Sequence, residues 1–547
     1  MKFLNIFFNS QTKTITGAAG ILVVSALISR ILGVLRDWLL AKTFGASPDL
    51  DAYFAAFRIP DLVYNILIAG GITIVFLPLF SEYFFKNKEE AWKFANNLIN
   101  IFLFLLIILC LILLIFAPPL IKLITPGFNP QQINLTILLT RLMLLSPILL
   151  GLSSIFSGIL QYFNRFLAYS LCPILYNLGI ISGILFLSPC TGVLRVAIGV
   201  IFGAFLHFAI QIPSAISCGF RYQPIFNIKN MGIKKVFTLM LPRIFAIAGL
   251  QINLIVITAI ASTLAAGSIV IFNLSNNLQY FPIGIIGVSF AVAAFPALTK
   301  SWVEGGKENF IKGFSSIFRQ IIYLTIPISV LIFILRNQIV EIILKHGEFN
   351  YSAAQLTAAS LGLFSFGILA SSLTPLISRA FFSFQDTKTP TLIVVFSMAL
   401  NIILSFYLTW ILKSENFFNL LIRDTLLIKG IEDIRVLALP LAFSIGVIFQ
   451  FLLLLTFLYR RIGDFKLKEI SNSFLKISVA SLLMIGGVYL ILFLVSPFLN
   501  TQTFSGVFWQ TLIGSLVGVL VYLITTFLLK SPEIKTLEPL VFKRFRK

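Results

Sequence analysis

The chain alternates long apolar stretches with short polar connections. A bilayer core of about 30 Å requires about 20 apolar residues per helix, and fourteen stretches of this kind can be placed along the sequence. They lie at residues 18–41, 57–82, 98–121, 135–160, 166–187, 193–216, 236–263, 268–297, 314–335, 355–382, 390–412, 436–459, 474–496 and 506–529. The pattern predicts an all-α polytopic membrane protein with about 14 transmembrane helices and no soluble domain.

Basic residues concentrate in alternate loops. With the N-terminus inside, the inside segments contain 27 of the 41 Lys and Arg residues and the outside segments contain nine. This asymmetry follows the positive-inside rule, so both termini are predicted to be cytoplasmic. A net charge of +21 would suggest nucleic acid in a soluble protein. Here topology accounts for it, and no nucleic-acid partner is expected.

Composition narrows the chemistry further. Hydrophobic residues make up 58% of the chain and charged residues 11%, far from soluble averages. Two histidines and four cysteines without a CxxC pair leave too few ligands for the usual metal, haem or iron–sulfur sites. No Walker A motif is present. The first apolar stretch contains Arg30, Arg36 and Asp37 and is too long for a cleavable signal peptide.

The two halves of the chain show weak similarity at an offset of about 220 residues. Phe-Leu-Pro-Leu-Phe-Ser at 76–81 corresponds to Ala-Phe-Pro-Ala-Leu-Thr at 294–299. An offset of six helices preserves orientation, which predicts two six-helix lobes in parallel pseudo-repeat around a central cavity. Chance likeness between apolar segments is the alternative. The expected divisions are 1–228 (helices 1–6), 229–465 (helices 7–12) and 466–547 (helices 13–14 and a basic cytoplasmic tail).

Several charged residues fall within the predicted spans. An intramembrane charge costs about 2.5–3.5 kcal/mol on insertion scales, so such groups normally face protein or water. On the first helix Arg30 and Asp37 share a face, and Arg36 points elsewhere. Arg58 and Asp61 are three residues apart and can pair locally. A cavity that binds an anionic substrate and a buried structural network both explain these charges, and the gathering of cations favours the substrate.

Polar uncharged residues also gather within the apolar stretches. Amides on predicted helices 7 and 8 are expected either to line a wet cavity or to bond helix to helix; they are Asn253, Asn273, Asn276, Asn277 and Gln279. His207 is expected to be a hydrogen-bonded core residue.

Specific motifs accompany this pattern. They are Ser-Arg-Ile-Leu-Gly-Val-Leu-Arg-Asp at 29–37, Phe-Gly-Ala at 44–46, Asp-Ala-Tyr-Phe at 51–54, Phe-Arg-Ile-Pro at 57–60, Phe-Leu-Pro at 76–78, Phe-Pro-Ile-Gly at 281–284 and Asp-Thr-Lys-Thr-Pro at 386–390. Together they resemble the MurJ (MviN) family of lipid II flippases in the MOP exporter superfamily, over nearly the whole chain.

The resemblance implies a transporter in the bacterial inner membrane. It would move lipid II, the undecaprenyl-pyrophosphate-linked peptidoglycan precursor, from the inner to the outer leaflet by alternating access. The implied substrate-binding residues are Arg36 for the pyrophosphate, Asp37 beside it, and Arg30 and Arg58 in support. Asp51 is the implied gate at the outer end. Helices 13 and 14 would form a groove for the lipid tail.

The chain departs from the family pattern at cavity positions. Tyr64 and Asn65 stand where many relatives carry an Arg pair, Asn277 stands at a cavity Arg position and remains a candidate substrate contact, and Ile257 replaces a polar residue. These differences leave the exact substrate and Na⁺ coupling open, and the identity of any metal stays unknown. Because the membrane potential favours outward movement of an anion, we expect transport to be driven by voltage. We also expect the protein to act as a monomer and to need no cofactor.

Two other functions compete with this one. The chain could export another polyprenyl-linked glycan or a small solute, which the missing arginines suggest. It could also be a membrane glycosyltransferase whose catalytic acid lies in Asp49-Leu50-Asp51. Short outer loops and the repeat favour a transporter, so the protein is not expected to be an enzyme.

Overall fold

The computed structural model describes residues 15–66, 73–304, 306–428, 430–500 and 503–534. Within these ranges the regular structure is helical, and no β-strand occurs. Eleven helices in the described part are long and apolar enough to cross a membrane, which confirms the all-α membrane class. Predicted spans 18–41, 57–82 and 236–263 are not among these eleven, and the count of fourteen stays a prediction.

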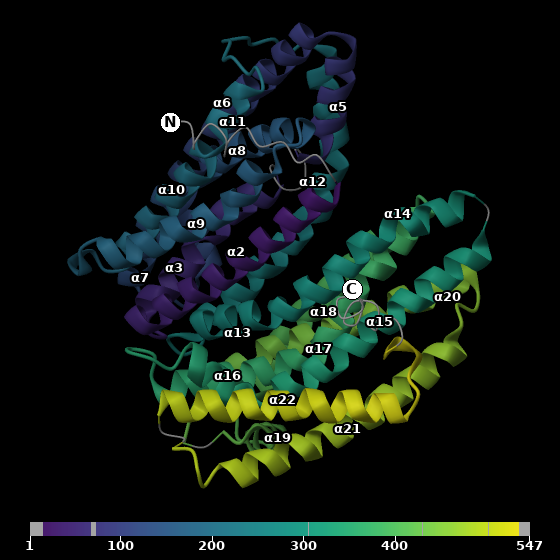
Figure 1. The fold of residues 1–547 in the computed structure, drawn as a ribbon. Helices are drawn as coiled ribbons and strands as arrows, with labels where there is room; N and C mark the ends of the chain where they lie inside the picture. Colours follow the sequence, from purple (N-terminus) through teal and green to yellow (C-terminus); the bar gives the residue numbers. More distant parts are fainter. Residues whose placement is uncertain (1–14, 67–72, 305, 429, 501–502, 535–547) are drawn as a thin grey trace. The chain divides into compact units, whose positions relative to one another are not determined.

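Two compact units make up the chain, Met1–Val270 and Ile271–Lys547, drawn as ribbons in Figure 1. The helices that begin in the first unit are α2 (Ile15–Phe44), α3 (Pro48–Ala56), α4 (Arg58–Val63), α5 (Thr73–Lys86), α6 (Lys88–Ile124), α7 (Pro130–Met143), α8 (Leu145–Tyr162), α9 (Phe166–Phe186), the 3-10 turn η2 (Pro189–Thr191), α10 (Leu194–Ala209), α11 (Gln211–Ser217), α12 (Met231–Ser262) and α13 (Ser268–Pro282).

Aromatic side chains dominate one core of the first unit. Phe80 on α5 is fully buried, and its ring packs edge-to-face against Trp92 of α6 and Tyr162 of α8, with centroids 5.4 and 5.3 Å away.

Polar residues define where the helices begin. Asn87 caps α6 by accepting from the amides of Glu89 and Glu90, so two of the backbone donors that lack a partner within the helix are satisfied.

Helices α9 and α10 approach each other through glycine. Gly179 and Gly183 on α9 face Gly199 and Gly203 on α10, and each pair follows a Gly-xxx-Gly spacing. A Cβ at Gly179 would lie 2.2 Å from the Gly203 Cα, and one at Gly183 would lie 2.6 Å from the Gly199 Cα. Small residues at this spacing let membrane helices pack backbone to backbone, so α9 and α10 form a closely packed pair.

The second unit continues α13 and adds the remaining helices. They are the π-helix η3 (Ile283–Val288), α14 (Ser289–Val303), α15 (Lys307–Ile334), α16 (Arg336–Ile343), α17 (Tyr351–Ser383), α18 (Lys388–Ile411), α19 (Phe417–Leu426), the 3-10 turn η4 (Arg435–Leu437), α20 (Ala438–Ile462), α21 (Leu467–Val495) and α22 (Phe504–Leu528).

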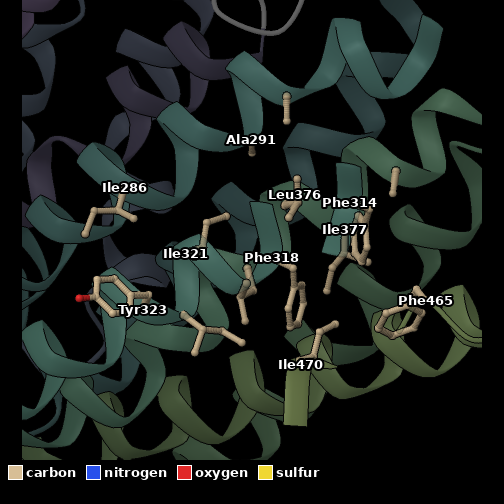
Figure 2. Packing of buried hydrophobic residues seen from close by; sticks show 14 of the residues in the cluster. Ile286, Ala291, Phe314, Phe318, Ile321, Tyr323, Leu376, Ile377, Phe465 and Ile470 are labelled. Carbon is tan, nitrogen blue, oxygen red and sulfur yellow. The ribbon is translucent and has the colours of Figure 1, made fainter. Parts of the chain in front are cut away.

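The core of the second unit lies around α15 and α17. Figure 2 shows Phe314 and Phe318 of α15 near Leu376 and Ile377 of α17, with Phe465 approaching from the segment before α21. All five side chains are buried. α14 carries Pro296 inside the helix, as α5 carries Pro78 in the first unit, at the positions that the sequence repeat aligns.

The last two helices pack along each other, as the yellow-green ribbon of α21 and the yellow ribbon of α22 show in Figure 1. They are joined to α15 by buried polar contacts. The Tyr522 hydroxyl of α22 donates to the Tyr323 carbonyl at 2.7 Å. Beyond α22, Glu533 accepts from Ser473 at 2.7 Å and lies 3.7 Å from Arg319. α21 and α22 are therefore fixed to the second unit at several points.

The sequence-based divisions stay predictions about transport lobes. α12 begins after the expected boundary at residue 228, yet it packs against α4, α5 and α6 and falls within the first compact unit. Most of the basic tail, residues 535–547, lies outside the described residues.

Asp386 stabilises the start of α18. Its carboxylate accepts from the Thr389 amide at 3.0 Å and from the Thr389 hydroxyl at 2.8 Å, and Arg461 lies 3.7 Å away. Partial burial acts to raise the pKa of this carboxyl, but the bonds from Thr389 and the charge of Arg461 together lower it. The ionised form is therefore the one that stabilises the fold.

Asp386→Ala is expected to destabilise the protein by about 1–2 kcal/mol, because it removes the carboxylate that accepts from the Thr389 amide in the first turn of α18 and leaves that backbone donor without its partner. Since the folded-state pKa is lowered, this contribution is complete above the ordinary value of about 4 and is lost as pH falls below it. Thermal unfolding of both proteins in detergent should show a Tm difference at pH 7 that shrinks at acid pH. A difference that does not change with pH would contradict this account of Asp386.

Candidate functional site

The centre of the candidate site is an ion pair between sequence neighbours on α2. Arg36 Nη2 lies 2.8 Å from Asp37 Oδ1, and Arg36 Nε donates to the same oxygen at 3.0 Å. The Arg36 side chain is 24% exposed and that of Asp37 is 10% exposed. The guanidinium is thus held by a buried carboxylate and remains partly accessible.

A third residue completes this arrangement from α9. Asn177 Oδ1 accepts from Arg36 Nη1 at 3.2 Å, and Asn177 Nδ2 donates to the Ser29 carbonyl at 3.2 Å. The buried Asn177 side chain is therefore hydrogen-bonded to α2 at Ser29 and at Arg36, which lie about two helical turns apart. Figure 1 shows α2 and α9 running next to each other, as their contacts require. Arg36 is oriented by the packing of α2 on α9.

Arg58 reaches a different helix from the one expected. Its Nε donates to the Thr258 hydroxyl of α12 at 2.7 Å, and the side chain is buried. Asp61 is near enough to interact with it electrostatically. The local pair predicted from the sequence is thus part of a contact between α4 and α12, and Arg58 serves to join these helices.

Asp51 on α3 binds the backbone at the beginning of α13. Its Oδ2 accepts from the Gly267 amide at 2.5 Å and its Oδ1 accepts from the Val270 amide at 2.9 Å. The carboxylate is 3% exposed. A helix N-terminus has unpaired amide donors and a partial positive charge, both of which favour a carboxylate. Asp51 therefore caps α13 from a separate helix.

Gly267 allows this cap to form. Its φ is +87°, a conformation that glycine adopts without strain. A Cβ at this position would lie 2.4 Å from the Ala46 carbonyl oxygen. The turn between α12 and α13 therefore approaches the turn between α2 and α3 closely enough for Asp51 to reach it.

The other predicted residues lie in different surroundings. Arg30 lies on α2 and lines a cavity of about 520 Å³ in the first unit. Asn277 is exposed on α13 and belongs to the second unit, whereas Arg36 belongs to the first. Tyr64 lines the same cavity as Arg30. No group of three metal-binding side chains occurs among residues that the structure describes.

Sequence reasoning missed the partners of the predicted residues. Asn177, Thr258 and Gly267 each complete a contact, but all are more than 130 positions from the residue they bind. Of these three, only Gly267 carried a usable signal, because glycine marks turns and is tolerated at the residue before a helix begins. Asn177 and Thr258 are ordinary polar residues within apolar helices, and nothing in their spacing distinguishes them.

Comparisons with known proteins agree with the motifs. The family model described as "Lipid II flippase MurJ" matches residues 40–509. A protein of Buchnera aphidicola subsp. Acyrthosiphon pisum named "Probable lipid II flippase MurJ" is 29% identical over 506 residues, covering 91% of this chain and 94% of its own. A protein of Borreliella burgdorferi with the same name is 30% identical, covering 71% of this chain and 76% of its own.

Solved structures give the same result. A structure described as "Lipid II flippase MurJ, inward closed conformation" is 28% identical, with a TM-score of 0.76 over 94% of this chain and 99% of its own. An inward-facing multidrug MATE transporter of the MOP superfamily reaches a TM-score of 0.64 over 81% of this chain and 99% of its own, at 13% identity, which supports the fold alone. Because the family model covers most of the chain, the protein belongs to the MurJ family of lipid II flippases.

Proposed function

We propose that this protein moves lipid II from the inner to the outer leaflet of a bacterial inner membrane. The observation that carries the proposal is Arg36, a partly exposed arginine within the predicted span 18–41 that is fixed by Asp37 and Asn177 in a chain of the MurJ family. Because an intramembrane charge is costly, its retention calls for a compensating function. An anionic substrate supplies one.

The geometry of Arg36 suits a pyrophosphate. A guanidinium has five N–H donors, and three of them are used by Asp37 and Asn177. The second hydrogens of Nη1 and Nη2 remain for a ligand. Two donors in one plane can bind two phosphate oxygens at once, and arginine stays protonated in a low-dielectric cavity. Arg30, six residues earlier on α2, adds positive charge on the same helix.

Asp51 supports a closing role at the outer end. Its bonds to the start of α13 join two turns, α2–α3 and α12–α13, and both must separate if a passage opens there. We propose that these bonds form in the outward-closed state and break when the substrate is released. The membrane potential supplies the drive, at about 2.3 kcal/mol per unit charge per 100 mV, and the protein acts as a monomer with both termini cytoplasmic.

The geometry of Asp51 argues against the glycosyltransferase alternative. A catalytic acid must donate or accept a proton at the substrate. Both oxygens of this carboxylate accept backbone hydrogen bonds, and the side chain is buried. Asp51 is therefore used for joining helices, which fits a transporter.

Complementation tests the proposed function. Expression in a strain depleted of its own lipid II flippase is expected to restore growth and the exposure of lipid II on the outer leaflet. The inserted amount of protein is measured in parallel by immunoblot of membranes. A well-inserted protein that restores neither growth nor exposure would contradict the assignment and would favour another polyprenyl-linked substrate, with Tyr64, Asn65 and Asn277 as the first positions to exchange.

A further inference from the structure

A cavity in the first unit lies beside the Arg36 group. Its volume is about 520 Å³, within the range of about 300–1,000 Å³ typical of small-molecule sites. The walls come from four helices, α2, α8, α9 and α10, together with Tyr64. We name it the hydroxyl pocket after the residues that line it: Leu22, Ser25, Ala26, Ser29, Arg30, Tyr64, Ser154, Ser157, Tyr169, Ser170, Cys172, Pro173 and His207.

Hydroxyl groups form most of the polar lining. Five serines and two tyrosines contribute, whereas Arg30 is the single residue of fixed charge and no carboxylate is present among these lining residues. The lining therefore favours a ligand that is largely neutral and rich in hydrogen-bonding groups.

The polar lining is held in place by hydrogen bonds. Ser25 of α2 donates to Ser170 of α9 at 3.0 Å, and Ser157 of α8 donates to Gln211 at 2.9 Å. All three serines are buried. His207 Nδ1 lies 2.6 Å from the Ser153 hydroxyl, so Nε2 is the ring nitrogen available for a ligand. These hydrogen bonds fix the walls, so the pocket is preformed.

The pocket is placed correctly for a group attached to a pyrophosphate. Arg30 lines it, and Arg36 is six residues farther along α2, which corresponds to about 9 Å along the helix axis. Ser29 belongs to the pocket and also accepts from Asn177, the residue that orients Arg36. A pyrophosphate at Arg36 and a sugar in the pocket would thus occupy adjoining positions along one helix.

We propose that the hydroxyl pocket binds the sugar next to the pyrophosphate of the transported lipid and so selects lipids that carry a glycan. This rests on the proposed function, because it assumes a polyprenyl-pyrophosphate substrate at Arg36. The sugar's hydroxyl and acetamido groups match the serine, tyrosine and histidine lining. Tyr64 gives this part of the pocket a neutral hydroxyl for a neutral sugar.

The test compares two lipids that differ in the glycan. Full-length protein in nanodiscs is titrated with undecaprenyl pyrophosphate and with lipid II, and a Kd is measured for each. Ser154→Leu fills the pocket while sacrificing only a bond to the backbone of its own helix. It is expected to weaken lipid II binding about ten-fold, equivalent to one or two hydrogen bonds, and to leave undecaprenyl pyrophosphate binding unchanged.

Two further variants separate the pocket from general damage. Ala26→Leu fills the pocket from α2 and should reproduce the selective loss, so the result does not depend on one variant folding. Ser329→Leu is the matched control, because Ser329 is also a half-buried serine bonded to its own helix, on α15 of the second unit. It is expected to bind both lipids like the wild type.

The outcomes distinguish the two proposals. Unchanged lipid II binding in both pocket variants, or equal weakening for both lipids, would overturn the role of the hydroxyl pocket while leaving the flippase assignment intact. Equal wild-type affinity for the two lipids would do the same. A wild-type protein that binds neither lipid would overturn both proposals.

Discussion

Arg36→Ala is expected to reduce lipid II transport to an undetectable level. The substitution removes the group proposed to bind the pyrophosphate, and it leaves the mostly buried Asp37 without the two bonds it accepts. Removing one partner of a buried ion pair costs about 3–5 kcal/mol, so part of the loss could come from instability. Outer-leaflet lipid II exposure, normalised to inserted protein, gives the transport measurement.

Two companion variants separate these effects. Arg36→Lys keeps the charge but loses the planar pair of donors, and transport is expected to fall at least about ten-fold. The double variant Arg36→Ala/Asp37→Ala removes both charges and should recover thermal stability without recovering transport. Wild-type transport by a stable double variant would show that the pair is purely structural.

Asp51→Ala is expected to open the outer end and stop the transport cycle. The amides of Gly267 and Val270 lose their acceptor, at about 1–3 kcal/mol for each unsatisfied donor, and the α13 N-terminus loses a favourable charge. Two donors at about 1 kcal/mol or more each correspond to a shift of at least about thirty-fold toward the open state. A membrane-impermeant maleimide can measure it at Ser268→Cys, a buried position that begins α13.

The chain supplies a close control for this experiment. Asp49 is two residues earlier on α3 and is exposed, so Asp49→Ala should leave labelling and transport unchanged. The exposed Cys190 is replaced by serine in every background to remove its own reaction with maleimide. Equal labelling of Ser268→Cys with and without Asp51 would rule out a gating role for the carboxylate.

The sequence predicted the membrane class well, because hydropathy and loop charge act over whole segments. It predicted the breaks within individual helices less well. The stretch at 135–160 is divided into α7 and α8 around Leu144, and the stretch at 268–297 contains the π-helix η3. Such breaks depend on tertiary packing: a Cβ at Gly287 would lie 2.5 Å from the Ser372 Cα of α17, and no local pattern encodes that contact.

The sequence identified charged residues of the candidate site but not the residues that they contact. Charge within apolar sequence identified Arg36, Asp37 and Arg58, since burying charge is costly wherever it occurs. Their fixed geometry comes from Asn177 and Thr258, which lie far away in the sequence. The hydroxyl pocket was missed as well, because single serines in apolar helices carry little signal until four helices bring them together.

The glycine contact between α9 and α10 limits how this protein can move. With no side chain between the two backbones, α9 and α10 cannot shift relative to each other without a steric clash. The two helices are therefore expected to move together as one rigid body. A force that tilts α10 is transmitted to α9 and, through Asn177, to α2 and its arginine. Four residues without side chains would then couple the rotation of this helix pair to the orientation of Arg36, the cation proposed to bind the pyrophosphate.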